Sequence, residues 1–291
     1  MTPSTSGARR LVRTSGFILV FAILAGATYQ GIATALERRA FPRPGGLVSI
    51  GDHQLHLYCA GSGSPTVILE APAAGASAAW ADVQAPLAAL TRVCSYDRSG
   101  LGWSEAGDRP HDPGRVPEEL RTLLTAAKEN GPFVIAGHGL GAAYARMFAA
   151  RPDGEVAALV VIDPPGRDMA PDAVLRWTMA ASPWLARVGL LRAGQMLARR
   201  AEVLGGASGE AMRAFLNRPD HLTRAAAEFA KWDEAVRLAD QGPVPASLAV
   251  VTVTLDDPAR IEFLRPAPDA ERVVSAVEAA ILSARAGRTE P

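Results

Sequence analysis

Apolar and polar residues follow two different periodicities along most of this chain, and the two alternate. Short continuous apolar runs are typical of strands that are buried on both faces of a sheet. Such runs occur at Thr66–Leu69, Val93–Tyr96, Phe133–Ala136 and Val156–Ile162. Between them, apolar residues recur three and four positions apart, which predicts helices. This alternation predicts an α/β fold with a mostly parallel sheet and helices on both faces.

Two further patterns refine the first half of the chain. The apolar segments Val48–Ile50 and Leu55–Tyr58 flank four turn-forming residues, so we expect a β-hairpin there. After the first buried run, Val83, Leu87 and Leu90 have helical spacing and predict a helix that extends as far as Leu90.

The pattern changes between residues 168 and 240, where no strand signal occurs. Phe229, Trp232 and Val236 predict one clear amphipathic helix, and earlier segments have a similar spacing. This stretch is therefore expected to be an all-helical insertion between two parts of the sheet.

The sheet is expected to resume after the insertion. Leu248–Val253 is the segment where it resumes, and Ile261–Leu264 is a candidate for a short last strand. Asp269 is placed to cap a final helix, whose buried face would include Val273 and Val277.

The N-terminus indicates a membrane. Arg9, Arg10 and Arg13 precede an apolar tract from Gly16 to Ala35, just long enough to cross a bilayer core as one helix. Ala25–Ala27 also resembles a cleavage site, so a secretory signal is an alternative, and a buried soluble helix is a third. We favour an uncleaved single-pass anchor with the following domain outside the cytoplasm.

Composition narrows the function further. The chain has 291 residues and a formal net charge of +0, so nothing suggests a nucleic-acid partner. No phosphate-binding loop, dinucleotide motif or metal-ligand pattern occurs, and we expect neither cofactor nor metal. Of the two cysteines, Cys59 and Cys94, we expect buried thiols, with a disulfide in an oxidising compartment as the alternative.

The segment Phe133–Gly141 carries the most specific signal, because a buried strand runs into a glycine-rich turn and then a helix. This is the setting of the nucleophile elbow, whose pattern is G-x-S-x-G. Here the five residues are Gly137, His138, Gly139, Leu140 and Gly141. The position of the nucleophilic serine is occupied by Gly139, which has no side-chain oxygen.

Four segments together resemble the α/β-hydrolase family, in particular its membrane-anchored bacterial members. They are Leu55–Gly63, Tyr96–Ser104, the elbow segment Phe133–Gly141 and Val160–Asp163. The resemblance covers roughly residues 46–286 and implies an α/β-hydrolase fold with a helical cap, preceded by a transmembrane helix. The expected segments are an anchor or signal at 1–40, the first part of the core at 46–167, the cap at 168–240 and the rest of the core at 241–286.

The resemblance also implies where a catalytic triad would lie. The base should be a histidine late in the chain, yet His221 is the last histidine, and we expect it to be a surface residue of the cap. His138 is expected to be a packed histidine, with a role as substitute base as the alternative. Asp256 and Asp257 occupy the acid position, either as relics of the acid or as an ordinary turn.

The remaining candidate residues concern the oxyanion hole and the pocket. Ala73 and Leu140 would supply the two backbone N–H donors, although Pro72 is expected to reshape the first of these turns. We expect Ser99 and Ser104 to be structural. Three large apolar residues of the cap are expected to lie in its core, with a pocket lining as the alternative: Trp177, Trp184 and Phe215.

Three functional hypotheses follow, of which the last is a decayed hydrolase with no selected function. The first is a catalytically degenerate member that binds a small apolar or ester-like ligand, or a protein partner that the sequence does not identify, at the membrane. The second is an active hydrolase with a non-standard arrangement around His138, assisted by Asp256 or Asp257 and using direct attack by water.

Overall fold

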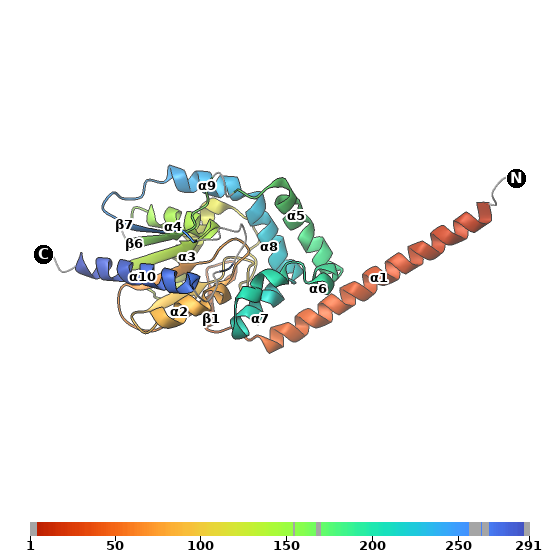
Figure 1. Ribbon diagram of the computed structural model, residues 1–291, viewed down its shortest axis with the longest axis horizontal. Helices are drawn as coiled ribbons and strands as arrows, with labels where there is room; N and C mark the ends of the chain where they lie inside the picture. The colour runs from red at the N-terminus through yellow and green to blue at the C-terminus, as the bar shows by residue number, and fades with distance from the viewer. Residues whose placement is uncertain (1–4, 154, 167–169, 256–262, 264–267, 288–291) are drawn as a thin grey trace.

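A seven-stranded sheet forms the centre of the protein in its computed structural model, which describes residues 5–153, 155–166, 170–255, 263 and 268–287 (Figure 1). The strand order is β1-β2-β4-β3-β5-β6-β7. The strands are β1 (Gly46–Ser49), β2 (Gln54–Ala60), β3 (Thr66–Glu70), β4 (Val93–Tyr96), β5 (Phe133–His138), β6 (Val156–Ile162) and β7 (Ala249–Val253).

The sheet is mostly parallel, as the sequence predicts. Strands β1 and β2 form the expected antiparallel hairpin, and β2 is also antiparallel to β4. All other neighbouring strands are parallel. Of the expected last strand, only Phe263 lies within the described residues, and it is buried but not in a strand.

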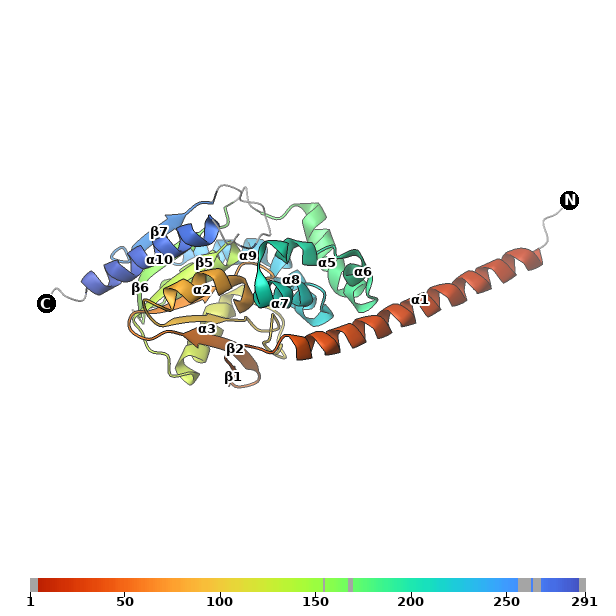
Figure 2. The same cartoon turned by 60° about the horizontal axis from the view of Figure 1, so that its bottom comes forward.

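Helices cover both faces of the sheet, and alternate residues of one strand separate the two layers (Figure 2). Val67 and Leu69 pack with α2 (Ala81–Leu87) and α10 (Asp269–Ala286). Ile68, between them, packs with α3 (Val116–Ala126) and α4 (Leu140–Ala149). This separation follows from the two-residue period of a strand.

Three details of the predicted helices were wrong. Helix α2 ends at Leu87, and Leu90 lies beyond it with an exposed side chain. Asp269 is the first helical residue and does not cap α10, because Pro268 is the N-cap. The single helix expected around Trp232 is two helices that meet at Lys231.

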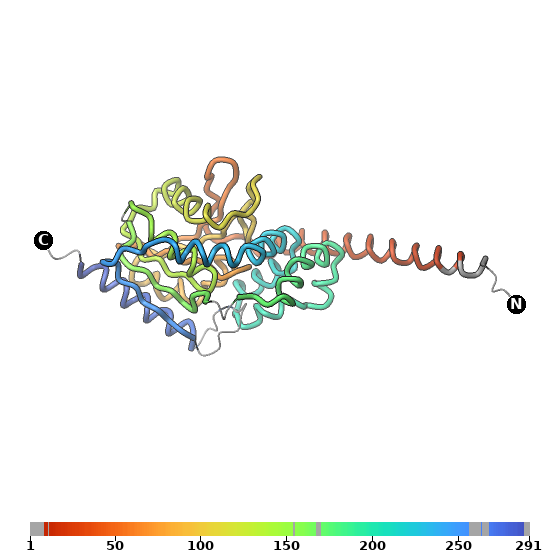
Figure 3. Tube along the Cα trace, turned by 90° about the horizontal axis from the view of Figure 1, so that it is seen from above, coloured from red at the N-terminus to blue at the C-terminus, as the bar shows by residue number. Residues whose placement is uncertain are grey.

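Most of the helices between β6 and β7 lie together at one end of the sheet, whereas the last of them runs back over the core beside α4 (Figure 3). They pack on the core of the domain through a shared apolar cluster that includes Leu140 and Tyr144 from α4 and Met179 and Phe229 from the insertion. These elements are α5 (Ala173–Arg187), α6 (Leu190–Gly194), the 3₁₀ helix η4 (Ala198–Val203), α7 (Gly206–Phe215), α8 (Pro219–Ala230) and α9 (Trp232–Gln241).

Helix α1 (Thr5–Ala40) projects from the domain as a single long helix (Figure 1). Its segment Val12–Ala40 is long and apolar enough to cross a membrane. Residues 12–25 are exposed, whereas Gln30, in the second half, is buried against the insertion helices. The C-terminal end of α1 is also held in place, because the Trp103 indole N–H donates to the carbonyl of Phe41, the residue after the helix, at 3.2 Å.

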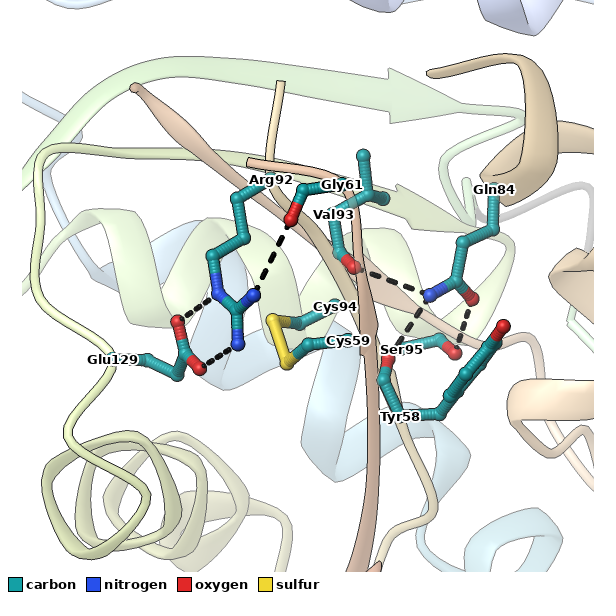
Figure 4. Close-up of a disulfide and its surroundings, with 9 residues drawn as sticks. All are labelled: Tyr58, Cys59, Gly61, Gln84, Arg92, Val93, Cys94, Ser95 and Glu129. Carbon is teal, nitrogen blue, oxygen red and sulfur yellow. Dashed lines mark hydrogen bonds and ion pairs between the residues drawn. A yellow bond between two sulfur atoms is a disulfide. The ribbon is translucent and has the colours of Figure 1, made fainter. Parts of the chain in front are cut away.

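The two cysteines form a disulfide, so the expectation of two buried thiols was wrong (Figure 4). Cys59 and Cys94 are directly opposite each other on the antiparallel pair β2–β4, which brings their side chains together. Beside the disulfide, the Arg92 guanidinium donates two hydrogen bonds to the Glu129 carboxylate, one from Nε and one from Nη2. The bridge therefore joins neighbouring strands, a pairing that depends on sheet register rather than on sequence spacing.

Candidate functional site

The elbow adopts the strained backbone that a nucleophile position requires. Gly139 separates the end of β5 from the start of α4, with φ of 54° and ψ of −124°. Its N–H donates to the Ile162 carbonyl at 2.9 Å, which ties the turn to β6. The turn thus has the geometry of an elbow, but its apex presents no side-chain atom.

The three elbow glycines are required for different reasons. A Cβ on Gly137 would lie 2.4 Å from the Gly141 carbonyl oxygen, and one on Gly141 would lie 2.4 Å from the Ala71 oxygen. A Cβ on Gly139 would meet only the Pro72 Cβ, at 3.8 Å, which is ordinary contact. The outer glycines therefore permit close backbone packing, whereas the central one is favoured only by its positive φ.

The expected oxyanion donors lie next to this apex and are buried. Leu140 is the first residue of α4, so its N–H has no acceptor within the helix. Ala73 belongs to the loop after β3, where the Gly75 N–H donates to the Pro72 carbonyl at 2.9 Å. Both Ala73 and Leu140 belong to the apolar cluster beneath the insertion helices, so the floor of the site is apolar.

A buried ionic network holds this loop, and its centre is Arg98. The guanidinium lies 2.6 Å from Glu70 and 2.7 Å from Glu228, and it donates to the Ala71 and Pro72 carbonyls. Glu228 also accepts from the Ala74 N–H at 3.1 Å. Burial raises the pKa of Glu228, but Arg98 outweighs burial and leaves the pKa below its usual range.

Sequence reasoning missed this network because its members are far apart in the chain. Glu228 lies on α8, 130 residues after Arg98, and no local pattern marks it as a partner. The available signal was one acidic residue, Glu228, on the mostly apolar face of α8. Burial of such a residue requires a countercharge.

His138 is buried beneath the elbow, as expected of a packed histidine. Its Nε2 lies 4.0 Å from Asp163 Oδ2, and its Nδ1 has no hydrogen-bond partner among the described residues. Burial lowers the pKa of His138 to about 4, with a smaller opposing effect from Asp269. The imidazole is therefore neutral at neutral pH and a weak base.

Asp163 serves mainly to join two strand ends. Its carboxylate accepts from the Leu255 N–H at 2.9 Å, and its own N–H donates to the Val253 carbonyl at 2.9 Å. Burial raises the pKa of this carboxyl group. Asp256 and Asp257, the expected acid candidates, follow directly in the chain but lie outside the described residues.

His221 is fully buried, so its expected surface position was wrong. Its Nδ1 accepts from the Gly102 N–H at 3.0 Å, and its Nε2 lies 3.0 Å from the Ala74 carbonyl, which fixes a neutral tautomer. Its ring stacks on Phe215. Burial lowers the pKa of His221 to about 4, with a further contribution from Arg218. This histidine links the insertion to the core loops.

The serines near Asp97 are structural, as expected. Ser104 Oγ donates to the Asp97 carbonyl at 2.6 Å, and Ser99 Oγ accepts from the Gly107 N–H at 3.0 Å. Ser77, His56 and Asp97 also lie together, but both partners contact the same Nδ1 of His56, while Nε2 faces the Pro44 carbonyl. A triad needs the two ring nitrogens to contact different partners, so this cluster is not one.

Metal-ligand geometry was found in one place among the described residues, at Cys59, Cys94 and Glu129. The two sulfur atoms are joined in a disulfide, so neither is a thiolate that could bind a metal ion. This group therefore does not serve as a metal site in the oxidised protein.

Known proteins match this chain in sequence over limited stretches. An uncharacterised protein of Schizosaccharomyces pombe is 35% identical over 114 residues, which are 38% of this chain and 21% of that protein. An uncharacterised vacuolar membrane protein of Saccharomyces cerevisiae is 38% identical over 76 residues, which are 26% of this chain and 12% of that protein. The chain thus matches about a fifth or less of the length of these relatives.

Solved structures match over most of the chain. The Cif epoxide hydrolase of Acinetobacter nosocomialis has a TM-score of 0.65 at 13% identity and covers 88% of this chain and 96% of its own. A membrane phospholipase A, described as a bacterial virulence factor, has a TM-score of 0.57 at 18% identity and covers 96% of this chain and 97% of its own. These likenesses show the fold.

The family assignment rests on the sequence profile together with the fold. The profile described as the alpha/beta hydrolase family matches residues 57–287, from β2 to beyond the end of α10. Its span includes the elbow, the helices inserted between β6 and β7, and the last strand. The chain therefore belongs to the alpha/beta hydrolase family.

Proposed function

We propose that this protein is a membrane-associated alpha/beta hydrolase that has lost serine catalysis and acts as a ligand-binding or interaction module. The observation that carries the proposal is Gly139 at the apex of a well-formed elbow. In serine hydrolases, removing the triad leaves only about 10³–10⁴-fold acceleration over water. The missing nucleophile and the missing late histidine together argue against a selected hydrolytic role.

The surroundings of the elbow support ligand binding of an apolar kind. Ala73 and Leu140 are buried among apolar residues of the insertion helices, which we take as the cap at residues 168–240. The loop that carries Ala73 is held rigidly by Arg98 and Glu228. A small apolar or ester-like molecule is the ligand class that such a floor would accept.

Membrane association is the second part of the proposal. Helix α1 is long and apolar enough to cross a bilayer, and a matched relative is described as a vacuolar membrane protein. We place the folded domain outside the cytoplasm, where the Cys59–Cys94 disulfide would be stable.

The decisive test of lost catalysis uses the full chain in detergent. The protein is treated with a fluorophosphonate probe, any adduct is mapped by mass spectrometry, and short-chain p-nitrophenyl esters are assayed in parallel. We expect neither an adduct nor turnover above the detergent buffer. A stoichiometric adduct on any serine would overturn the proposal.

Ligand binding needs its own measurement. Non-hydrolysable alkyl ethers of increasing chain length are added to the full chain, and Tm is followed. A ligand that binds only the folded state raises Tm. A rise in Tm with chain length supports a ligand site, and no rise at any length favours a protein partner instead.

A hydrolase centred on His138 is the second candidate. The observation in its favour is that the imidazole lies 4.0 Å from the Asp163 carboxylate, beside the elbow. Its low pKa weakens it as a base for water. This candidate predicts turnover that is lost in His138→Ala, whereas equal turnover in parent and variant rejects it.

A further inference from the structure

Large apolar side chains are exposed on α5 and in the segment that follows it. Trp177 and Trp184 are 77% and 71% exposed, so the prediction that both lie in the core was wrong. Phe215 is buried, as predicted. On α5, residues 174, 177 and 184 share one helix face. We call the following set the apolar cap face: Val174, Trp177, Trp184, Leu190 and Met196.

Arginines surround this face, and two of them pair with acidic residues from elsewhere in the chain, Arg176 with Asp233 and Arg192 with Glu37. Residues 173–201 contain five arginines and neither aspartate nor glutamate, in a chain whose formal net charge is +0. The Arg187 guanidinium lies over the Trp184 ring at 4.9 Å, and Arg199 and Arg200 are exposed nearby in sequence. Tryptophan, leucine and arginine together are typical of segments that lie in the membrane interface.

Helix α1 packs beside the apolar cap face. The contacts between them show which residues of α1 lie at the same membrane depth as that face. A Cβ on Gly26 would lie 2.2 Å from the Val188 carbonyl oxygen, so the helix backbone packs directly on the turn between α5 and α6. Gln30 donates to the Asn217 carbonyl at 2.7 Å, and Arg192 binds both Gln30 and Glu37. Figures 1 and 2 show α5 and α6 at the end of the domain from which the free half of α1 projects.

The free half of α1 is too short to cross a bilayer alone. Between Arg13 and Gly26 there are 12 residues, which span about 18 Å at 1.5 Å per residue. A hydrocarbon core is about 30 Å thick and needs about 20 residues. If the core begins just after Arg13, it extends to about residue 33, roughly 10 Å beyond the level of Gly26.

The second half of α1 is consistent with this depth. Its side away from the insertion carries exposed apolar residues, Ile32 and Leu36, with Tyr29 near the level of Gly26. The helix can therefore remain in lipid on one side while it packs on α5 and α6 on the other. Neighbouring parts of the insertion must then enter the membrane as well.

We infer that the apolar cap face is embedded in the interface of the same bilayer that α1 crosses. The inference rests on the membrane anchoring proposed above and adds where the domain sits. Interfacial helices bury their apolar face about 5–10 Å into the headgroup and acyl boundary, which matches the missing length of α1. The exposed Arg187 and Arg199 would contact anionic headgroups.

Tryptophan fluorescence tests this directly, because α1 contains no tryptophan. Trp80 and Trp232 are buried and Trp103 is half-buried, so Trp177 and Trp184 are the ones that lipid can reach. The full chain is reconstituted into vesicles of phosphatidylcholine and phosphatidylglycerol, with or without brominated acyl chains. We expect bromine to quench the emission, and the double variant Trp177→Phe/Trp184→Phe to lose this quenching.

The outcomes separate the two proposals. Protein that floats with the vesicles but shows equal emission in both lipids overturns the inference and leaves anchoring intact. Protein that does not float overturns both. Quenching that persists in the double variant also overturns the inference. Emission that changes only with the amount of protein per vesicle overturns it as well and indicates contact with a second copy of the chain.

A charged substitution provides a matched comparison that keeps both reporters. Leu190→Glu places a carboxylate on the apolar cap face, whereas Leu282→Glu changes a similarly exposed leucine on α10, at the far end of the domain (Figure 1). We expect Leu190→Glu to lower the quenching and Leu282→Glu to leave it unchanged, with near-ultraviolet circular dichroism confirming that both fold. Equal quenching in the two variants would contradict the inference.

Discussion

The elbow and the Arg98 network both approach the loop at Pro72, yet they differ in what they contain. At the elbow, the backbone has its strained conformation while the functional side-chain atom is missing. In the network, by contrast, Arg98 is fully paired with two carboxylates and two carbonyls. The difference teaches that glycines and paired charges hold the site in shape independently of any nucleophile.

Breaking the network is expected to have the largest effect. Arg98→Ala leaves Glu70 and Glu228 buried without their countercharge, which costs about 3–5 kcal/mol. The free energy of unfolding, measured by urea denaturation, checks this. The control is Arg176→Ala, whose partner Asp233 is exposed and whose loss should cost about 1 kcal/mol or less. Equal losses would mean that the network is not the main support of the loop.

Acid is expected to weaken the protein through its buried histidines. His138 and His221 have pKa values near 4 in the folded state, below the ordinary value of 6.5, so unfolding takes up protons between these values. Stability is therefore present above pH 6.5 and is lost as pH falls toward 4, by about 2–3 kcal/mol for each histidine.

One variant isolates the histidine at the elbow. His138→Leu removes its proton linkage, and Nδ1 has no hydrogen bond to lose among the described residues. Urea denaturation from pH 7 to pH 4 should show a flatter pH dependence than in the parent. An unchanged slope would indicate that His138 titrates normally.

The glycines of the elbow provide a smaller, internal comparison. Gly141→Ala would place a Cβ 2.4 Å from a backbone oxygen, whereas Gly139→Ala would meet nothing closer than 3.8 Å. We expect a loss of about 3 kcal/mol for Gly141→Ala and about 1 kcal/mol for Gly139→Ala, the latter from its positive φ. A larger loss for Gly139→Ala, measured by thermal unfolding, would contradict this ranking.

Restoring the nucleophile is expected to have the smallest effect. Gly139→Ser supplies an oxygen at a position with room for it, but no late histidine is present and His138 is a weak base. We therefore expect ester turnover and fluorophosphonate labelling to stay at the level of the parent. Labelling at position 139 would show that a base is available and that only the serine had been lost.

Local patterns were enough for much of this molecule. The buried runs predicted the strands, helical spacing placed α3 and α4, and the G-x-G-x-G segment identified the elbow. These features depend on residues within a few positions of one another, since side-chain period and turn chemistry are local properties. The roles of Ala73 and Leu140 as donors stay predictions.

What the sequence by itself determined was therefore the fold and the missing nucleophile, because both are written in short segments. The tertiary structure decided which residues meet: it buried His221, exposed Trp177 and Trp184, and paired Arg98 with Glu228. A helix pattern shows that an apolar face exists but not what covers it, and a charge shows a need for a partner but not where that partner lies. Those answers depend on contacts between residues that are far apart in the chain.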